Sequence, residues 1–317
     1  MLEFVLRRLI QTIPVLLITS IAVFLVVRLI PGDPADYLTS EDAPPGTYER
    51  IQAELGLDRP WPVQYVEWVG GVIRGDFGTS FRTKFTVSDL LKRSLPPSLE
   101  LAAVSYVIAM AFGIPLGVMA GARPKSYWDW VLSSFTMTTI GIPNFLLGIL
   151  LLWVFAVILD WFPVAGRVSL FENPIDALWR LVLPALTLGA SQAAILARYT
   201  RTSVQESMGR DYIRTARSKG LTERAVIFRH GLRNALIPVV TIAGLQVGTL
   251  LSGVVIIETV FTRPGLGRTI IEAIQNRDYL VIQGMLLFLV TLYILVNLAV
   301  DITYGFLDPR LRSAKNG

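Results

Sequence analysis

The sequence contains no cysteine, and its only histidine is His230. A chain without cysteine forms no disulfide, no thiolate metal site and no cysteine nucleophile, and a single histidine excludes a site built from several histidines. Charged residues make up only 17% of the 317 residues, whereas soluble domains have about a quarter. Apolar residues make up 53%, they are clustered, and the mean hydropathy is +0.55. These features indicate an all-α integral membrane protein.

Motifs that carry chemistry are also missing. The sequence has no G-x-x-x-x-G-K-[ST] phosphate loop, no H-E-x-x-H pair and no G-x-S-x-G motif. We therefore expect no catalytic residue, no bound metal and no cofactor in this chain. The net charge of +5 does not indicate a nucleic-acid partner, because the basic residues stand mostly beside apolar runs, as the positive-inside rule predicts.

Six apolar segments are long enough, or nearly so, to cross a bilayer core of about 30 Å as helices. They run over Leu9–Ile30, Ser98–Ala120, Trp130–Leu159, Leu181–Ala197, Pro238–Ile257 and Val281–Thr303. The third contains Gly141 to Asn144 with Pro143, which predicts a kink or an interruption. The first is too long for a signal peptide and lacks a cleavage motif, which favours a retained anchor.

The distribution of Lys and Arg predicts the orientation. Nine basic residues lie between Arg198 and Arg233, whereas the short loops on the other side carry few. By the positive-inside rule this segment and both termini are cytoplasmic. The segment 31–97 then lies outside, where Tyr48–Leu57 and Val63–Ile73 are candidate helices of a small external cap. An inert packed loop is the alternative for this segment.

Within the spans, polar residues are mostly uncharged, because Arg28, Glu100 and Asp301 all lie near span ends. Ion-coupled carriers place ionisable groups at membrane depth, so the pattern disfavours a secondary carrier. Helix–helix hydrogen bonds explain most of the deep polar residues, and a minority could line a hydrated pathway. The candidates for that pathway are Asn144, Gln192, Gln246 and Thr249. Gly113, Gly117 and Gly121 form a small-residue ridge for close helix packing.

The basic segment 198–237 has the pattern of helix, glycine turn, helix. Ser203–Lys219 contains good helix formers, Gly220 can end a helix with positive φ, and Thr222 can cap the next helix with Glu223 in its first turn. The second helix enters the span at Pro238. Three interpretations remain: a loop on anionic lipid, a nucleic-acid patch, which six spans disfavour, and a docking element for a cytoplasmic partner, which the ordered pattern favours.

Within this segment, Arg214-Thr215-Ala216-x3-Gly220 resembles the EAA loop of ABC-transporter permeases, which docks on the ATPase subunit. The similarity is closest to the B-type permeases of dipeptide and oligopeptide systems. Further segments with this similarity are Asp211–Leu221, Arg229–Pro238, Leu29–Pro34, Leu55–Asp58, Gly75–Gly78, Pro184–Gly189, Glu258–Gly267 and Asp308–Arg310. Two departures from the general EAA pattern, Arg214-Thr215 for Glu-Ala and the late Pro238, are typical of the peptide branch.

The resemblance implies the fold and the assembly of a type I ABC importer in the bacterial inner membrane. Its partners would be a homologous C-type permease, two cytoplasmic ATPases that bind ATP and Mg²⁺, and an external substrate-binding protein. The residues implied for ATPase coupling are Tyr212, Arg214, Thr215, Ala216, Lys219, Gly220, Leu221 and Glu223. The loop has an arginine face of Arg210, Arg214 and Arg217 and a small-residue face of Ala216 and Gly220. Either face could dock, and which one does stays open at this point.

The sequence predicts an anchor helix over 1–30, an external segment over 31–97, a type I transmembrane domain over 98–306 and a cytoplasmic tail over 307–317. We expect the chain to be a permease subunit that moves peptides, without enzymatic activity of its own. The alternatives are the same kind of transporter for glutathione, nickel chelates, opines or short glycans, and a stand-alone carrier or channel.

Overall fold

The computed structural model describes residues 2–29, 35, 39, 44–169 and 171–307, without the side chains of 2–4 and 304–307. Predictions on Leu29–Pro34, Asp308–Arg310 and the tail 307–317 fall wholly or largely outside this part. The described residues form helices and no named strand, with one isolated bridge between Thr79 and Thr86. The chain divides into unit 1, residues 1–96 and 265–298, and unit 2, residues 97–264 and 299–317.

Unit 1 contains α1 (Leu2–Arg28), α3 (Thr47–Glu54), α4 (Trp61–Ile73), the first turns of α5 (Val87–Ala122), α12 (Leu266–Gln275) and most of α13 (Tyr279–Leu307). The two helices predicted between the first two spans are thus confirmed as α3 and α4. Pro60 and Pro62 start α4, because proline needs no donor partner in a first turn. Phe24 of α1 packs edge-on against Tyr65 of α4, with 5.3 Å between ring centroids.

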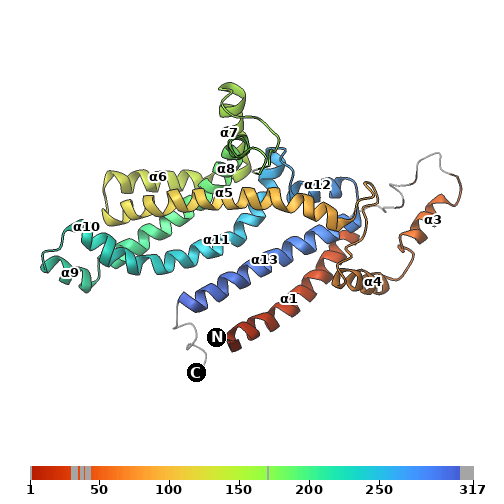
Figure 1. Ribbon diagram of the computed structural model, residues 1–317, viewed down its shortest axis with the longest axis horizontal. Helices are drawn as coiled ribbons and strands as arrows, with labels where there is room; N and C mark the ends of the chain where they lie inside the picture. The colour runs from red at the N-terminus through yellow and green to blue at the C-terminus, as the bar shows by residue number, and fades with distance from the viewer. Residues whose placement is uncertain (1, 30–34, 36–38, 40–43, 170, 308–317) are drawn as a thin grey trace. The chain divides into compact units, whose positions relative to one another are not determined.

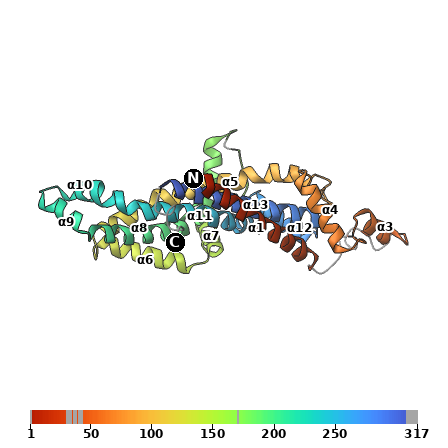
Figure 2. The ribbon, with the colours of Figure 1, turned by 90° about the horizontal axis from the view of Figure 1, so that it is seen from below.

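Unit 2 contains the rest of α5, α6 (Tyr127–Gly141), α7 (Asn144–Leu151), the π-helix η1 (Leu152–Ile158), α8 (Pro174–Met208) and α11 (Leu232–Val260). Helix α8 is central and packs against α6, α7 and α11. A hydrophobic core of unit 2 joins α5, α8 and α11 through residues such as Leu101, Leu188 and Ile257, which are fully buried. Figures 1 and 2 both show α6 running beside α8.

The glycine ridge of α5 lies against α8, as the spacing predicted. A Cβ built on Gly117 would lie 2.5 Å from the carbonyl oxygen of Ala197 and from Cβ of Thr200, closer than real Cβ contacts come. Gly113 and Gly121 meet α8 in the same way, each at under 3.0 Å from a backbone oxygen. Helices α5 and α8 therefore approach too closely for any side chain at these positions.

Among the described residues, five helices are long and apolar enough to cross a membrane. Helix α6 and the segment of α7 and η1 are bent by 103° relative to each other and together form a possible sixth span. The predicted interruption at Gly141 to Asn144 is confirmed, because α6 ends at Gly141 and α7 starts at Asn144. The second span was predicted too short: α5 starts at Val87 and continues through Pro96 and Pro97. Membrane helices tolerate such prolines because neighbours satisfy the freed backbone groups.

Candidate functional site

The predicted coupling segment lies at one end of the α8–α11 pair in unit 2 (Figures 1 and 2). It comprises α9 (Asp211–Ser218), α10 (Glu223–Ala225) and the π-helix η2 (Val226–Gly231), which continues directly into α11. We call residues 209–231 the tip segment. One prediction was wrong here: Ser203–Lys219 is not one helix, because α8 ends at Met208 and Arg210 is extended, with ψ 153°.

A small apolar core fixes α9 against the rest of the chain. Ile213 and Ala216 of α9 and Val226 of η2 are buried together, and Met208 packs against them. Ala216 is 5% exposed and Ile213 is fully buried, so this face of α9 is turned inward. The small-residue side predicted as one of two docking faces is therefore occupied by the chain itself at Ala216.

Hydrogen bonds join the two sides of the tip segment. The Ser207 hydroxyl donates to the carbonyl of Gly231 at 2.8 Å, and its oxygen lies 2.7 Å from the Tyr212 hydroxyl. Because a serine hydroxyl has a single hydrogen, Tyr212 is the donor in the second bond. Ser203 donates to the carbonyl of Ala235 at 2.7 Å. These bonds tie the end of α8 to α9 and to the start of α11.

The turn between α9 and α10 depends on Gly220. Its φ is +77°, in the left-handed region, and a Cβ at this position would meet nothing within 4 Å. Thr222 then caps α10 by accepting from the amide of Ala225 at 3.4 Å. The predicted glycine turn and threonine cap are confirmed, and the requirement for glycine is conformational rather than steric.

Arg217 and Glu223 close this turn from outside. The Arg217 Nε donates to Glu223 Oε1 at 2.7 Å and Nη2 donates to Oε2 at 3.3 Å. The hydrogen bond to Glu223 raises the pKa of Arg217. Both side chains are about half exposed or more, at 46% and 62%, so the pair orients the turn more than it stabilises the fold.

The outward face of the tip segment is basic, with apolar side chains between the charges. Arg214 has 82% of its side chain exposed, and Thr215, Lys219 and Leu221 are exposed as well. Tyr212 is 39% exposed and Phe228, which the sequence analysis missed, is 59% exposed. Exposed aromatic and arginine side chains are enriched in protein interfaces.

Three of the four predicted pathway residues lie together between α8 and α11. Gln192 Nε2 donates to Thr249 Oγ1 at 3.2 Å, Gln246 Nε2 donates to the Gln192 carbonyl at 3.1 Å, and Thr249 Oγ1 donates to the Gln246 carbonyl at 2.9 Å. The first two bonds join α8 to α11, as the helix–helix interpretation expects, and the third lies within α11. A role of these residues in the pathway stays a prediction. Asn144 begins α7 and is outside this cluster.

A buried ionic cluster in unit 2 was not found from the sequence. Glu100 of α5 accepts from Arg167 Nη2 at 2.7 Å and from Arg263 Nη2 at 2.9 Å, and Ser98 donates to Glu258. Arg263 is 1% exposed and Glu258 is fully buried. Burial lowers the pKa of Arg263 and the Glu100 carboxylate opposes this effect, while arginine stays protonated. The partners are up to 163 residues apart, so no local pattern signals them.

The second charged cluster joins α6 to α8. Asp129, in the first turn of α6, accepts from Arg201 of α8 and from the Lys125 amide at 2.8 Å. Asp129 is 7% exposed. The charge is thus satisfied within the chain, and this pair holds α6 to the part of α8 that leads to the tip segment.

Comparison with known proteins places this architecture in one family. Residues 113–313 match the model of the binding-protein-dependent transport system inner membrane component, and residues 1–102 match that of the N-terminal part of such membrane components. A putative peptide transport system permease protein of Brucella abortus (strain 2308) is 42% identical over 98% of this chain and 99% of that protein. The dipeptide transport system permease protein DppB of Escherichia coli (strain K12) is 41% identical over 99% and 100%.

Solved structures agree on the fold. The MetNI methionine ABC transporter in inward-facing conformations gives a TM-score of 0.57 at 22% identity, covering 69% of this chain and 96% of that one. An amino acid ABC transporter solved with histidines gives 0.53 at 15% identity, covering 70% and 94%. Systems of this family combine their membrane components with a substrate-binding component and an ATPase. The chain belongs to the family of binding-protein-dependent transport system inner membrane components, and it is a multi-pass permease subunit with the type I importer fold.

Proposed function

We propose that this chain is a permease subunit of an ATP-driven importer for di- and oligopeptides, and that the tip segment couples it to a cytoplasmic ATPase. The peptide substrate is supported by relatives over 40% identical along nearly the whole chain, whose names describe peptide or dipeptide transport. The partners would be a C-type permease, two ATPases that bind ATP with Mg²⁺, and an external binding protein. Both termini would be cytoplasmic.

The observation that carries the coupling role is the construction of the tip segment. On its inward face, Ile213 and Ala216 pack against Val226 and Met208. Gly220 fixes its turn, and its basic face is exposed. A rigid element outside the spans, continuous with α11 and tied to α8, can pass a displacement of a docked partner to both helices. A flexible loop attracted to lipid would need neither the buried core nor the left-handed turn.

Isolation of the chain with its partners tests the assembly. We expect the chain, affinity-tagged and extracted from its native membrane, to bring a second permease and two ATPases with it, and peptide uptake to stop when either ATPase gene is deleted. Uptake that persists without the ATPases would instead indicate a stand-alone carrier. Ligand binding by the cognate external protein then separates peptides from glutathione, nickel chelates, opines and short glycans.

Charge reversal tests the docking face. Arg214→Glu changes the exposed face of α9 without touching its packed side, so we expect normal abundance and weaker copurification of the ATPases. Arg74→Glu makes the same change at an exposed position of the external segment and should leave copurification unchanged. Equal ATPase recovery with both variants would exclude the basic face as the docking face.

A further inference from the structure

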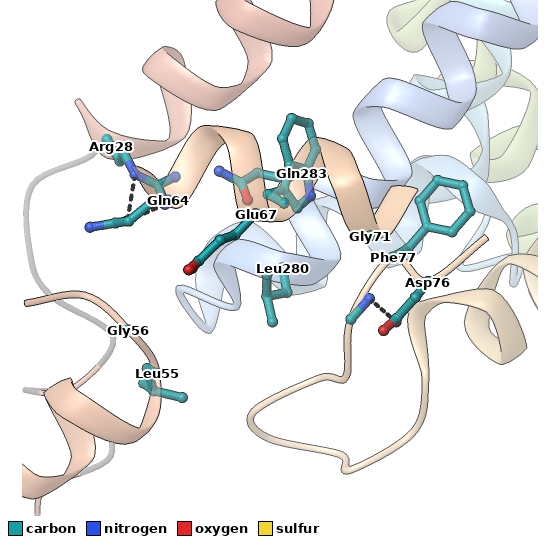
Figure 3. Close-up of a pocket in the computed structure, with 12 residues that line it drawn as sticks. Arg28, Leu55, Gly56, Gln64, Glu67, Gly71, Asp76, Phe77, Leu280 and Gln283 are labelled. Atoms are coloured by element: carbon teal, nitrogen blue, oxygen red, sulfur yellow. Dashed lines mark hydrogen bonds between the residues drawn. The ribbon is translucent and has the colours of Figure 1, made fainter. Parts of the chain in front are cut away.

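A polar cavity of about 230 Å³ lies within unit 1, lined by α1, α4, α13 and the loop that follows α4 (Figure 3). Three of its lining side chains come from three different helices: Arg28 from α1, Trp68 from α4 and Gln283 from α13. Trp68 is 9% exposed and Gln283 is 1% exposed. The cavity is therefore walled by buried polar groups that the fold brings together from distant parts of the chain.

Each of these three side chains leaves a buried hydrogen-bond donor without a partner in the part of the chain that the structure describes. The atoms are Arg28 Nη1, Trp68 Nε1 and Gln283 Nε2. An unmet buried donor costs stability, and most such groups in folded proteins are satisfied. Three in one cavity indicate a site that a ligand or partner completes.

Three side-chain acceptors of the cavity are already engaged. Gln64 Oε1 accepts from Arg28 Nε at 3.2 Å and from Nη2 at 2.5 Å. Glu67 accepts from Arg59 Nη1 at 2.5 Å, which offsets its charge, and Asp76 Oδ1 accepts from the Gly78 amide at 2.9 Å (Figure 3). Beside these, the cavity offers the three unmet donors to an incoming group, one of them cationic.

We infer that this cavity is a carboxylate-binding site, in which Arg28, Trp68 and Gln283 donate to the two oxygens of one carboxylate group. A carboxylate has no hydrogen to donate and accepts about four bonds, which matches a set of donors beside a guanidinium. The cavity is smaller than the roughly 300 Å³ of the smallest usual ligand pockets. It therefore holds one carboxylate end of a larger molecule, and the rest of that molecule stays outside.

Two sources could supply this group: the C-terminal carboxylate of a free peptide, or an acidic side chain of the external binding protein. Both sources rest on the proposed function, whereas the carboxylate chemistry of the cavity does not. Acetate is therefore the first probe, because its binding is independent of what the transporter carries. A dipeptide, the matching dipeptide amide and the cognate binding protein then distinguish the sources.

The most conservative variant is Trp68→Phe, which removes the indole N–H and keeps a ring beside Phe24 and Tyr65. Gln283→Leu removes the second donor at similar volume. Trp61→Phe is the matched control, since Trp61 is on the same helix, is 51% exposed and does not line the cavity. Loss of one bond to a charged group weakens binding about tenfold or more.

The assay is ¹⁹F NMR of the intact transporter labelled with 5-fluorotryptophan, with the Trp68 signal assigned by its loss in Trp68→Phe. We expect acetate, and not acetamide, to shift the Trp68 signal, and Gln283→Leu to weaken this response at least tenfold while Trp61→Phe leaves it unchanged. A Trp68 signal that acetate does not move, or that acetate and acetamide move alike, overturns the inference.

The sources follow from two further titrations. A shift with the dipeptide and not its amide assigns the carboxylate to free peptide. A shift only with the binding protein, with affinity lowered in Gln283→Leu, assigns it to that partner. No shift with either overturns a role in this transporter. Peptide uptake by the wild type is measured separately, so that its absence rejects the proposed function while the acetate response still decides the site.

Discussion

Gly220 gives the sharpest test of how the tip segment works. Its φ of +77° costs glycine nothing, whereas an ordinary residue in the left-handed region loses about 1–2 kcal/mol. A Cβ would meet nothing within 4 Å, so no steric clash adds to this cost. Gly220→Ala should therefore weaken the turn by about 1–2 kcal/mol. A β-branched valine is a stronger outlier there, and asparagine, which tolerates this conformation, should come close to the wild type.

A cost of this size acts locally. It raises the population of opened turn by roughly fivefold to thirtyfold, without unfolding spans that are held elsewhere. If the rigid turn transmits the partner's movement, opening it uncouples ATP hydrolysis from transport. We therefore expect uptake per ATP hydrolysed to fall in the order wild type, Gly220→Asn, Gly220→Ala, Gly220→Val, at equal membrane abundance.

The assay combines uptake and ATP hydrolysis in proteoliposomes with amide hydrogen exchange over residues 211–225. Gly209→Ala is the matched control. Gly209 is the C-cap residue of α8 and lies just before α9, as Gly220 lies just after it. Its φ is −82°, and a Cβ there would have its nearest contact at 3.6 Å. It should exchange and couple like the wild type. Normal coupling by Gly220→Val, or uncoupling by Gly209→Ala equal to that of Gly220→Ala, would refute the reasoning.

Two further predictions concern the packing of unit 2. Gly117→Leu places its side chain against the backbone of Ala197, so we expect overpacking to cost about 1–3 kcal/mol or more. The melting temperature and the abundance of the purified protein should both fall. Unchanged values would contradict the close approach of α5 and α8. Glu100→Gln removes the carboxylate that pairs with Arg263, which is 1% exposed, and should cost about 3–5 kcal/mol. Arg167→Gln changes a side chain that is 24% exposed and should cost about 1 kcal/mol or less. If thermal melts show Arg167→Gln to be the more destabilising of the two variants, the cluster is not buried.

Much of the fold could be predicted because its signals are local. Apolar runs long enough for a bilayer indicated the spans, the proline at 143 indicated the broken one, and the glycine spacing of α5 indicated a packed ridge. Pro96 and Pro97 misled the prediction of where α5 begins. A proline removes one donor, but whether the helix ends there depends on neighbours that a sequence does not reveal.

The candidate site also has features that the sequence predicted and features that only the packing shows. Gly220 and Thr222 were identified from residue type and order, because a left-handed turn and a helix cap are requirements of two or three consecutive residues. Ala216 was grouped with Gly220 as a small-residue face, and only the packing against Val226 places it inside. The break at Gly209 was missed because nearby residues such as Gln205 and Glu206 favour a continuous helix.

The sequence by itself determined a polytopic helical membrane protein with a hinged basic element between two spans, because hydropathy, charge bias and turn chemistry are properties of neighbouring residues. The tertiary structure decided which face of that element is exposed, which charges are buried, and that Arg28, Trp68 and Gln283 meet in one cavity. These features join residues many turns apart. Their pairing is set by how helices pack, and one sequence read along its length does not contain that distance information.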